Sequence, residues 1–422
     1  AVAALPSVVG VQWIERLCTT EGWAQIPGLV AGLSANRILL GVCNPYLFIQ
    51  PLKTLAQECG LNPGLCEAVA LDNLGGRKDG TATDVDKHLR TLRSGLMRLY
   101  YADPGKDVEG GLPVVRRALV VGGGVAGLTA AASIAAMGYP VTVAEQSDRL
   151  GGNLAWLKDT LAGEETAPLL EALCQQVENH PAVDLLLGAK VVGASGQVGD
   201  FTTNIQTAEG PVMIRHGAVF LATGGVEALP VDAPYGYGHL PGVVTQRELA
   251  QALDADADLP KKLDTLVFIQ CVGSRTAERP FCSQVCCPTT LKQVLFLKKA
   301  NPEVTLFVLY RDMMSPGFSE RYFTEARRAG VVFVPYTTDE PPTVAADADG
   351  GEKTLLVRAF DHILGAPIEI AATRVVLATG VTPQLPAELA EAYGARCDPD
   401  GFFAEADSKW RPLESLADGV FA

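Results

Sequence analysis

The sequence lacks the signals of an exported, membrane-spanning or nucleic-acid-binding protein. Its apolar N-terminal stretch has no cationic segment ahead of it and meets Glu15 and Arg16 before a membrane span could form. The 48 acidic residues outnumber the 34 basic ones, and the net charge of −14 leaves no basic stripe that could displace counterions from phosphates. We therefore expect a cytoplasmic protein that binds no nucleic acid and meets a membrane, if at all, only through partner chains.

Several cysteine and glycine motifs are also absent or rare. No CxxC pair occurs, which disfavours a thioredoxin-like dithiol, and there is no ferredoxin-type CxxCxxC motif. The glycine-rich GxGxxG turn occurs only once. Because cytosolic thiols are kept reduced, the ten cysteines are expected to be free thiols or metal ligands rather than disulfides.

The composition, with 48% hydrophobic and 19% charged residues, is that of a compact α/β protein. A strand at 37–42 and a helix at 83–101 predict a small N-terminal α/β domain over residues 1–112, closed by an acidic, glycine-rich linker. The other expected elements are a helix at 167–178 and strands at 183–192, 217–225, 265–270, 304–310, 331–335 and 374–380.

Two of these strands end in the same three residues, Ala-Thr-Gly, at 222–224 and 378–380. The repeat suggests one α/β domain, 113–240 and 366–422, that is interrupted by a second over 241–365. Residues 418–422 resemble the start of another strand, so we expect this sequence to be part of a longer polypeptide.

The single GxGxxG turn follows a strand at 118–121, opens a helix, and is followed by an acidic residue, Glu145, at the end of the next strand. Gly122 permits a tight turn, Gly124 lets the backbone approach a pyrophosphate, and Gly127 allows the helix to pack on the strand. The helix N-terminus offers free N–H donors to phosphates, and Glu145 would accept hydrogen bonds from ribose hydroxyls. The alternative is a purely structural glycine turn.

A second glycine pair, Gly151-Gly152, would also let the backbone come close to a ligand, although an ordinary turn has the same composition. The run from Glu145 through this pair resembles the FAD-binding segment of the thioredoxin reductase and glutathione reductase superfamily. The resemblance implies two Rossmann-like dinucleotide-binding-type domains behind the small N-terminal one, with FAD on the first. The FAD contacts that it implies are Gly122, Gly124, Val125, Ala126, Gly127, Glu145, Gln146, Arg149, Gly151, Gly152, Asn153, Val191, Ala222, Thr223, Gly224 and Gly380.

In that superfamily the second domain binds NAD(P)H, but here its opening strand, 265–270, is followed by Cys271-Val272-Gly273-Ser274-Arg275 and not by a phosphate turn. Three more cysteines follow closely: Cys282, Cys286 and Cys287. Four thiolates could surround one iron–sulfur cluster or one zinc ion. Some of them could instead be small buried hydrophobic residues, or two could form a thiol–disulfide pair.

The cysteine string, together with Leu291-Lys292 and Tyr310-Arg311-Asp312, resembles the A-type flavoprotein subunit of heterodisulfide reductase. The resemblance extends to the N-terminal domain, where Cys43-Asn44-Pro45 stands in place of a Cys-Ser-Pro-like turn. It implies a 4Fe-4S cluster on the four cysteines beside the FAD, in a protein that passes or bifurcates electrons within a complex of iron–sulfur proteins. It also implies that Lys292 lies near the flavin N5, whereas the residue by itself would be read as a solvated charge.

One departure from that family concerns residues 153–173, which contain no cysteine where the family usually carries a cysteine-rich insertion. The expected function is therefore FAD- and iron–sulfur-dependent electron transfer that depends on other chains to extend the path. The alternatives are a disulfide reductase that uses the cysteines covalently and a structural flavoprotein within such a complex. The remaining cysteines are expected to be buried or incidental: Cys18, Cys59, Cys66, Cys174 and Cys397.

Overall fold

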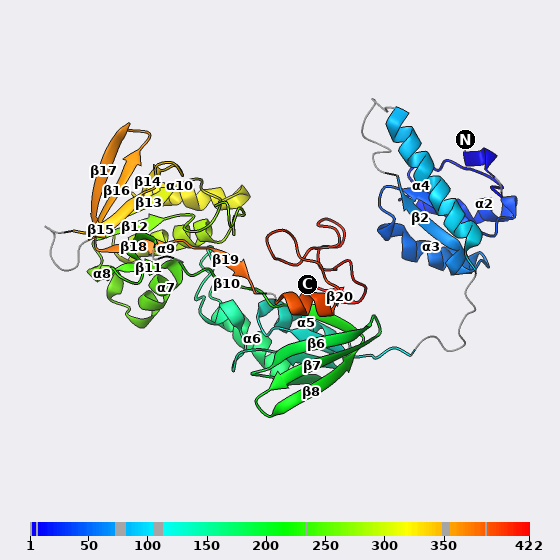
Figure 1. Cartoon of the computed structure of the whole chain (residues 1–422), viewed down its shortest axis with the longest axis horizontal. Coiled ribbons are helices and arrows are strands. Elements are labelled where there is room, and N and C mark those ends of the chain that lie inside the picture. The colour runs from blue at the N-terminus through cyan, green and yellow to red at the C-terminus, as the bar shows by residue number, and fades with distance from the viewer. Residues whose placement is uncertain are drawn as a thin grey trace. The chain divides into compact units, whose positions relative to one another are not determined.

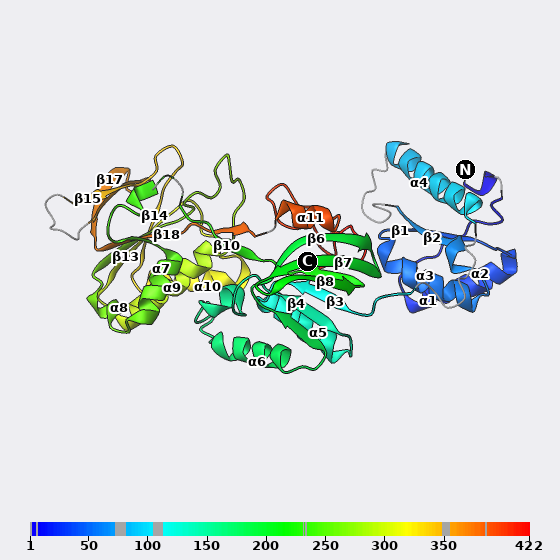
Figure 2. The same ribbon diagram turned by 60° about the horizontal axis from the view of Figure 1, so that its bottom comes forward.

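The computed structural model describes residues 2–5, 7–71, 82–103, 113–230, 232, 234–347, 355–384 and 386–422 (Figures 1 and 2). The chain forms two compact units, Ala1–Leu112 and Pro113–Ala422. The linker expected before residue 113 lies outside the described residues from 104 onward. Within the described ranges, none of the helices has the combination of length and hydropathy that a membrane span requires.

The first unit is built on a parallel pair of strands, β1 and β2, with Ile38 opposite Cys66. Helix α4 lies on one side of the pair and α2 and α3 lie on the other (Figure 2). The expected strand and helix are confirmed. The elements of this unit are η1 (Val2–Ala4), α1 (Thr20–Trp23), α2 (Ile26–Leu33), β1 (Ile38–Val42), α3 (Tyr46–Glu58), η2 (Pro63–Leu65), β2 (Cys66–Ala70) and α4 (Ala82–Tyr101).

The second unit contains two lobes with the same three layers. In the first lobe a five-stranded parallel sheet, ordered β20-β9-β3-β4-β5, has α5 and α6 on one face and the antiparallel sheet β6-β7-β8 on the other. The elements of this lobe are β3 (Ala118–Val121), α5 (Val125–Ala136), β4 (Val141–Ala144), η3 (Gly152–Ala155), α6 (Ala167–Glu178), β5 (Val183–Leu186), β6 (Lys190–Gln197), β7 (Asp200–Thr207), β8 (Gly210–His216), β9 (Ala218–Leu221), β10 (Gly225–Glu227), α11 (Ala387–Ala392) and β20 (Val420–Phe421).

The second lobe has a parallel sheet ordered β11-β18-β12-β13-β14, with helices α7, α9 and α10 packed on one face and the antiparallel sheet β15-β16-β17 on the other. Its elements are η4 (Pro234–Gly236), β11 (Val243–Thr245), α7 (Gln246–Ala255), α8 (Leu259–Lys262), β12 (Thr265–Ile269), α9 (Cys286–Ala300), β13 (Thr305–Tyr310), η5 (Gly317–Ser319), α10 (Glu320–Arg328), β14 (Val332–Pro335), β15 (Thr343–Ala346), β16 (Leu355–Asp361), β17 (Ala366–Ala372), β18 (Arg374–Leu377) and β19 (Val381–Pro383). The predicted pair of Rossmann-like domains behind a small α/β domain is confirmed.

One expected boundary is wrong. The sequence placed the return to the first lobe at residue 366, but β17 and β18 both pair within the second lobe. The two Ala-Thr-Gly strands are alike because both are buried parallel strands, and this pattern does not reveal which sheet a strand joins. The chain returns later, through β19, which pairs antiparallel with β10 and places Gly225 opposite Pro383.

A buried polar chain ties the antiparallel layer of the first lobe to its C-terminal segment. The ring of His216 contacts the Ala218 carbonyl through Nδ1 at 2.9 Å and the Thr203 hydroxyl through Nε2 at 2.7 Å, and Thr203 contacts the Tyr393 hydroxyl at 2.5 Å. The Ala218 carbonyl can only accept, so the proton of the neutral ring lies on Nδ1. Nε2 then accepts a hydrogen bond from the Thr203 hydroxyl, and the oxygen of that hydroxyl accepts one from the Tyr393 hydroxyl. This arrangement holds only the neutral imidazole.

Acid should therefore destabilise the first lobe through His216. Burial lowers the pKa of His216 from 6.5 to about 4, opposed by its bond to the Ala218 carbonyl. The unfolded chain takes up this proton first, so stability is full above pH 6.5 and falls as the pH drops toward 4. We expect a loss of about 2 kcal/mol between pH 7 and pH 5 from this group. Urea unfolding at pH 7 and at pH 5 measures this loss of unfolding free energy. His216→Gln should lose about 2 kcal/mol less than the unaltered protein. Equal losses in the variant and the unaltered protein would show that His216 is not the group responsible.

Candidate functional site

The GxGxxG turn is sterically restricted to glycine at two positions. Gly122 has φ +113°, and a Cβ there would lie 2.2 Å from the Ala222 carbonyl oxygen. A Cβ on Gly127 would lie 1.9 Å from the Gly122 carbonyl oxygen. Both contacts are with backbone that cannot move aside, so these two glycines are required by the fold itself.

Gly124 differs from them because its space is open. A Cβ on it would meet only Gly152 Cα, at 4.0 Å, and its backbone is extended at the N-cap of α5. The two glycine turns lie together: the Gly151 N–H donates to the Gly123 carbonyl at 2.8 Å, and Gly124 forms a parallel bridge with Gly151. The two glycine turns, residues 122–127 and 151–152, together form what is here called the first cradle. It combines open space beside Gly124, close backbone and a helix N-terminus, and this combination fits a pyrophosphate.

Glu145 braces this cradle. Its carboxylate accepts hydrogen bonds from the Gly123 N–H at 2.5 Å and from the Ser147 N–H and hydroxyl, each at 2.7 Å. Among the other predicted contacts, Gln146 and Arg149 are exposed, and Val191 is half-buried against the core of the first lobe.

The end of β9 closes the cradle from another side. Asn153 donates through Nδ2 to the Gly225 carbonyl at 2.8 Å, directly after the first Ala-Thr-Gly. Gly380 is placed differently, because a Cβ on it would lie 2.5 Å from Ser283 Oγ. Sequence reasoning grouped Gly380 with the flavin contacts, and the structure packs it against the cysteine loop.

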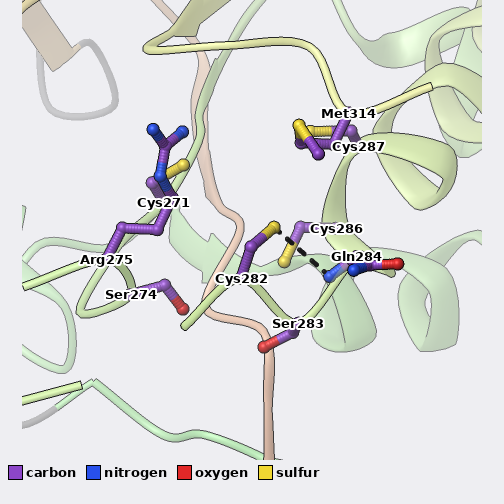
Figure 3. Close-up of a pocket in the computed structure, with 9 residues that line it drawn as sticks. All are labelled: Cys271, Ser274, Arg275, Cys282, Ser283, Gln284, Cys286, Cys287 and Met314. Atoms are coloured by element: carbon purple, nitrogen blue, oxygen red, sulfur yellow. Dashed lines mark hydrogen bonds between the residues drawn. The ribbon is translucent and has the colours of Figure 1, made fainter. Parts of the chain in front are cut away.

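The four clustered cysteines line one pocket in the second lobe. Cys271 follows Gln270, the first residue after β12. Cys282 lies in the loop between β12 and α9, and Cys286 and Cys287 are the first residues of α9. Figure 3 shows their sulfurs around the same space, with Met314 beside Cys287 and Arg275 beside Cys271. All four are free thiols. Side chains separated by up to sixteen positions in the chain are thus brought to the carboxyl edge of the sheet, where ligands of open α/β folds bind.

The loop that carries these cysteines is held in an unusual backbone conformation. Cys271, Arg275 and Gln284 have φ of +59°, +58° and +57°, values that side-chain-bearing residues rarely adopt. Ser283 fixes the loop to β19, because its hydroxyl donates to the Val381 carbonyl at 3.2 Å and accepts from the Val381 N–H at 3.0 Å. Residues in such backbone conformations cluster at functional sites, which makes this loop a candidate site.

Burial and mutual proximity dominate the electrostatics of the pocket. Burial, followed by the neighbouring thiols of Cys287, Cys271 and Cys282, raises the pKa of Cys286 to about 12. Burial also raises the pKa of Cys287 to about 11, opposed by a backbone hydrogen bond at Met314. In the absence of a bound cation, these two thiols hold their protons at neutral pH.

A buried amide network lies behind the two helix cysteines. Gln270 donates to the Thr290 hydroxyl at 2.5 Å and accepts from the Cys287 thiol at 3.9 Å, and Tyr336 donates to the Gln270 carbonyl at 2.6 Å. Gln246 donates to Thr290 at 2.7 Å and to the Cys286 carbonyl at 3.0 Å. Sequence reasoning missed these residues, since nothing in their local pattern marks a glutamine that reaches a distant helix.

Lys292 is not a solvated surface charge. Its side chain is 15% exposed, and Nζ donates to the Asp159 carbonyl at 2.9 Å and forms an ion pair with Asp159 Oδ1 at 3.1 Å. Asp159 follows the second glycine turn by only a few residues, so Lys292 reaches from α9 to the chain that leaves the first cradle. A second ion pair between the lobes, Lys158–Asp254 at 2.5 Å, is close by in sequence.

The remaining cysteines lie outside the pocket. Cys18, Cys43 and Cys397 are exposed, whereas Cys59, Cys66 and Cys174 are half-buried. Among the residues that the structure describes, no group of three or more histidine, cysteine, aspartate or glutamate side chains is arranged to hold a single metal ion.

Comparisons with known proteins found one matching family and a set of similar proteins and structures. Residues 116–278 match the family described as Pyridine nucleotide-disulphide oxidoreductase. Solved structures with similar coordinates include the thioredoxin reductase of T. acidophilum, with a TM-score of 0.48 and 17% identity over 73% of this chain and 89% of that one. The thioredoxin reductase of Lactococcus lactis also has a TM-score of 0.48, with 16% identity over 73% of this chain and 89% of that one. The family match and the cradle define the chain as an oxidoreductase with a flavin-type cofactor site.

Among curated proteins, the chain is similar to the A-type iron-sulfur subunits of CoB–CoM heterodisulfide reductase. It is 26% identical to the one numbered 2 in Methanopyrus kandleri and 25% identical to the one in Methanocaldococcus jannaschii. Each alignment covers 99% of this chain and 77% of the relative. The predicted resemblance is confirmed. The alignment with the Methanopyrus protein spans 520 positions, more than this chain has residues, so that relative carries extra residues within the matched region.

Proposed function

We propose that this chain is the flavoprotein subunit of a multi-subunit oxidoreductase, carrying FAD on the two glycine turns and a 4Fe-4S cluster on Cys271, Cys282, Cys286 and Cys287. The observation that carries the proposal is the meeting of these four cysteines in one pocket at the carboxyl edge of the second sheet. When bound, the flavin supplies both one- and two-electron chemistry, and the cluster supplies single-electron transfer. The partners would be iron–sulfur subunits that continue the electron path.

The residues of the first cradle fit FAD. Gly124 leaves room for a pyrophosphate beside the N-terminus of α5, and the Gly151–Gly152 turn is bonded to the same backbone. Glu145 stands at the end of the adjacent strand, where it also holds the turn in shape through Gly123. An FMN lacks the adenosine and the second phosphate for which this arrangement provides contacts.

The cysteine pocket offers four thiol ligands to an iron–sulfur cluster. A zinc ion would draw its sulfur ligands to about 2.3 Å from one point. A cluster instead binds each thiolate to a different iron, so its sulfurs surround a larger volume. Burial raises the pKa of Cys271, and the nearby guanidinium of Arg275 opposes this rise, because a positive charge favours a thiolate.

A disulfide reductase that uses these cysteines covalently is the second candidate. It requires a thiolate to attack a disulfide, yet burial raises the pKa of Cys286 to about 12 and that of Cys287 to about 11. Protonated, buried thiols are poor nucleophiles, whereas a metal deprotonates a coordinating thiol outright. Cys286 and Cys287 are therefore poor candidates for the attacking thiol.

NADH and NADPH are expected to leave the flavin oxidised. Residues Cys271-Val272-Gly273 occupy the position after β12 where a phosphate turn would stand, and Cys271 directs its thiol into the pocket instead. Anaerobic mixing with either nucleotide, followed by the flavin absorbance, measures this. Reduction within seconds would show that the second lobe still binds a nicotinamide nucleotide and would restore an ordinary reductase function.

Lys292 is proposed to place a positive charge near the flavin N5. Its ammonium is held by both the carbonyl and the carboxylate of Asp159, in the segment that follows the second glycine turn. We expect Lys292→Ala to retain both cofactors and to lower the flavin midpoint potential, because a nearby cation stabilises an anionic reduced flavin. Spectroelectrochemical titration measures the shift. Lys298→Ala, near the other end of α9, is the control. Equal flavin midpoint potentials in the two variants would show that Lys292 does not act on the flavin.

A further inference from the structure

Three arginines lie in or directly behind the cysteine loop of a chain whose net charge is −14. Arg275 is paired with Asp312 at 2.7 Å, so a carboxylate accompanies its charge. Arg311 donates to the Arg275 carbonyl at 3.0 Å, and its charge acts on Cys271. The third, Arg279, has a different environment.

Arg279 is held only by neutral acceptors. Its Nη2 donates to Ser274 Oγ at 2.7 Å and to the Thr379 carbonyl at 2.6 Å, with the Val272 carbonyl at 3.4 Å. Its Nε–H is buried without a hydrogen-bond partner. Within the described ranges, no carboxylate forms an ion pair with it. The guanidinium thus brings an unneutralised positive charge to the wall of the pocket, since Ser274 lines that pocket.

Part of this guanidinium is removed from water. Arg279 is half-buried, and its buried Nε–H has lost hydration that no hydrogen bond replaces. Partial burial lowers the pKa of Arg279, and a thiolate at Cys286 would oppose this effect. Protonated thiols supply no compensating charge, whereas four thiolates around an iron–sulfur group do.

We propose that Arg279 stabilises the more negative, reduced state of the iron–sulfur group on the four cysteines through its unpaired charge, and thereby sets its reduction potential. The inference rests on the proposed function. Reduction adds one electron from an external one-electron reductant and breaks no bond, so the group gains one negative charge. A nearby cation that is not paired with a carboxylate stabilises this added negative charge. Net charge is one of the factors that set the reduction potential of a cluster.

The test is a redox titration of the iron–sulfur signal in the anaerobically purified chain, with dithionite as reductant and EPR detection. Arg279→Gln should lower the equilibrium constant for reduction of the iron–sulfur group about tenfold, which lowers its reduction potential by about 59 mV for one electron. Arg279→Lys keeps the charge and should restore most of the potential, although it loses the fixed hydrogen bonds. Arg328→Gln on α10, which removes the same charge from an exposed position outside the pocket, should leave the potential unchanged. A structural role would make Gln and Lys equally destabilising without moving the potential, and that result overturns the proposal.

A second pair of variants covers the case in which Arg279→Gln does not fold. Gly273 is exposed, has φ +60°, and a Cβ on it would lie 3.7 Å from Arg279 Nη2. Asp and Asn both tolerate this backbone, so Gly273→Asp would pair Arg279 with a carboxylate and Gly273→Asn would supply the uncharged match. The Asp variant should have the lower potential, and equal potentials overturn the proposal. If the unaltered chain binds no iron, the proposed function fails as well; if it binds iron but Arg279 has no effect, only this inference fails.

Discussion

Cys286→Ala is expected to abolish the iron signal of the purified chain while leaving its FAD in place. Cys286 is buried, and its thiol interacts with those of all three other pocket cysteines, so its loss should remove the cluster rather than only weaken it. The FAD cradle is built from a different sheet, β3 and its neighbours, and shares no residue with this pocket. Iron should fall from about four atoms per chain to below one.

The control for this variant is Cys397→Ala, which removes an exposed cysteine from the C-terminal segment and should retain all the iron. Deletion of a single buried sulfur costs about 1 kcal/mol of packing, so Cys286→Ala should still fold and bind FAD. A variant that keeps its iron would show that Cys286 is a small buried residue and not a ligand. Simultaneous loss of FAD and iron would mean that the two sites are not independent.

Gly124→Val should release FAD without unfolding the first lobe. A Cβ at this position meets nothing closer than Gly152 Cα at 4.0 Å, and the backbone there is extended, so valine is compatible with the empty fold. Its methyl groups would, however, occupy the space through which the pyrophosphate passes. We expect FAD affinity to fall roughly 100-fold or more, equivalent to about 2.7 kcal/mol.

Gly193→Val is the matched control, because Gly193 has an ordinary φ and no atom within 4 Å of the added Cβ. Circular dichroism and thermal melting of the FAD-free proteins would show that both variants fold, and fluorescence of released flavin would measure binding. Full FAD occupancy in Gly124→Val would place the dinucleotide elsewhere. Substitution of Gly127 would not serve, since its Cβ would collide with the Gly122 carbonyl whether or not a ligand is bound.

The parts of the fold that sequence reasoning predicted are those that local sterics determine. The glycine turn at 122–127 could be recognised because Gly122 and Gly127 each meet backbone that excludes any side chain. Buried strands such as β3 and β12 are continuous apolar runs, as parallel strands covered on both faces must be. The cysteine cluster was visible because four thiols within seventeen residues rarely occur without a function.

The parts that could not be predicted depend on contacts between distant segments. Arg279 reaches the Thr379 carbonyl, 100 residues away, and Lys292 reaches Asp159 across 133 residues. Nothing in the local pattern of either residue indicates these partners. For the same reason the sequence assigned the strand at 374–377 to the wrong lobe, because pairing with β11 and β12 is a property of the assembled sheet.

The most direct test of the proposed function is the cofactor content of the unaltered chain, purified without oxygen. Acid release and chromatography identify the flavin, and colorimetric assays count iron and acid-labile sulfide. We predict one FAD with about four irons and four sulfides per chain, as one 4Fe-4S cluster requires. Zinc in place of iron, iron without sulfide, or FMN as the sole flavin would contradict the proposed function.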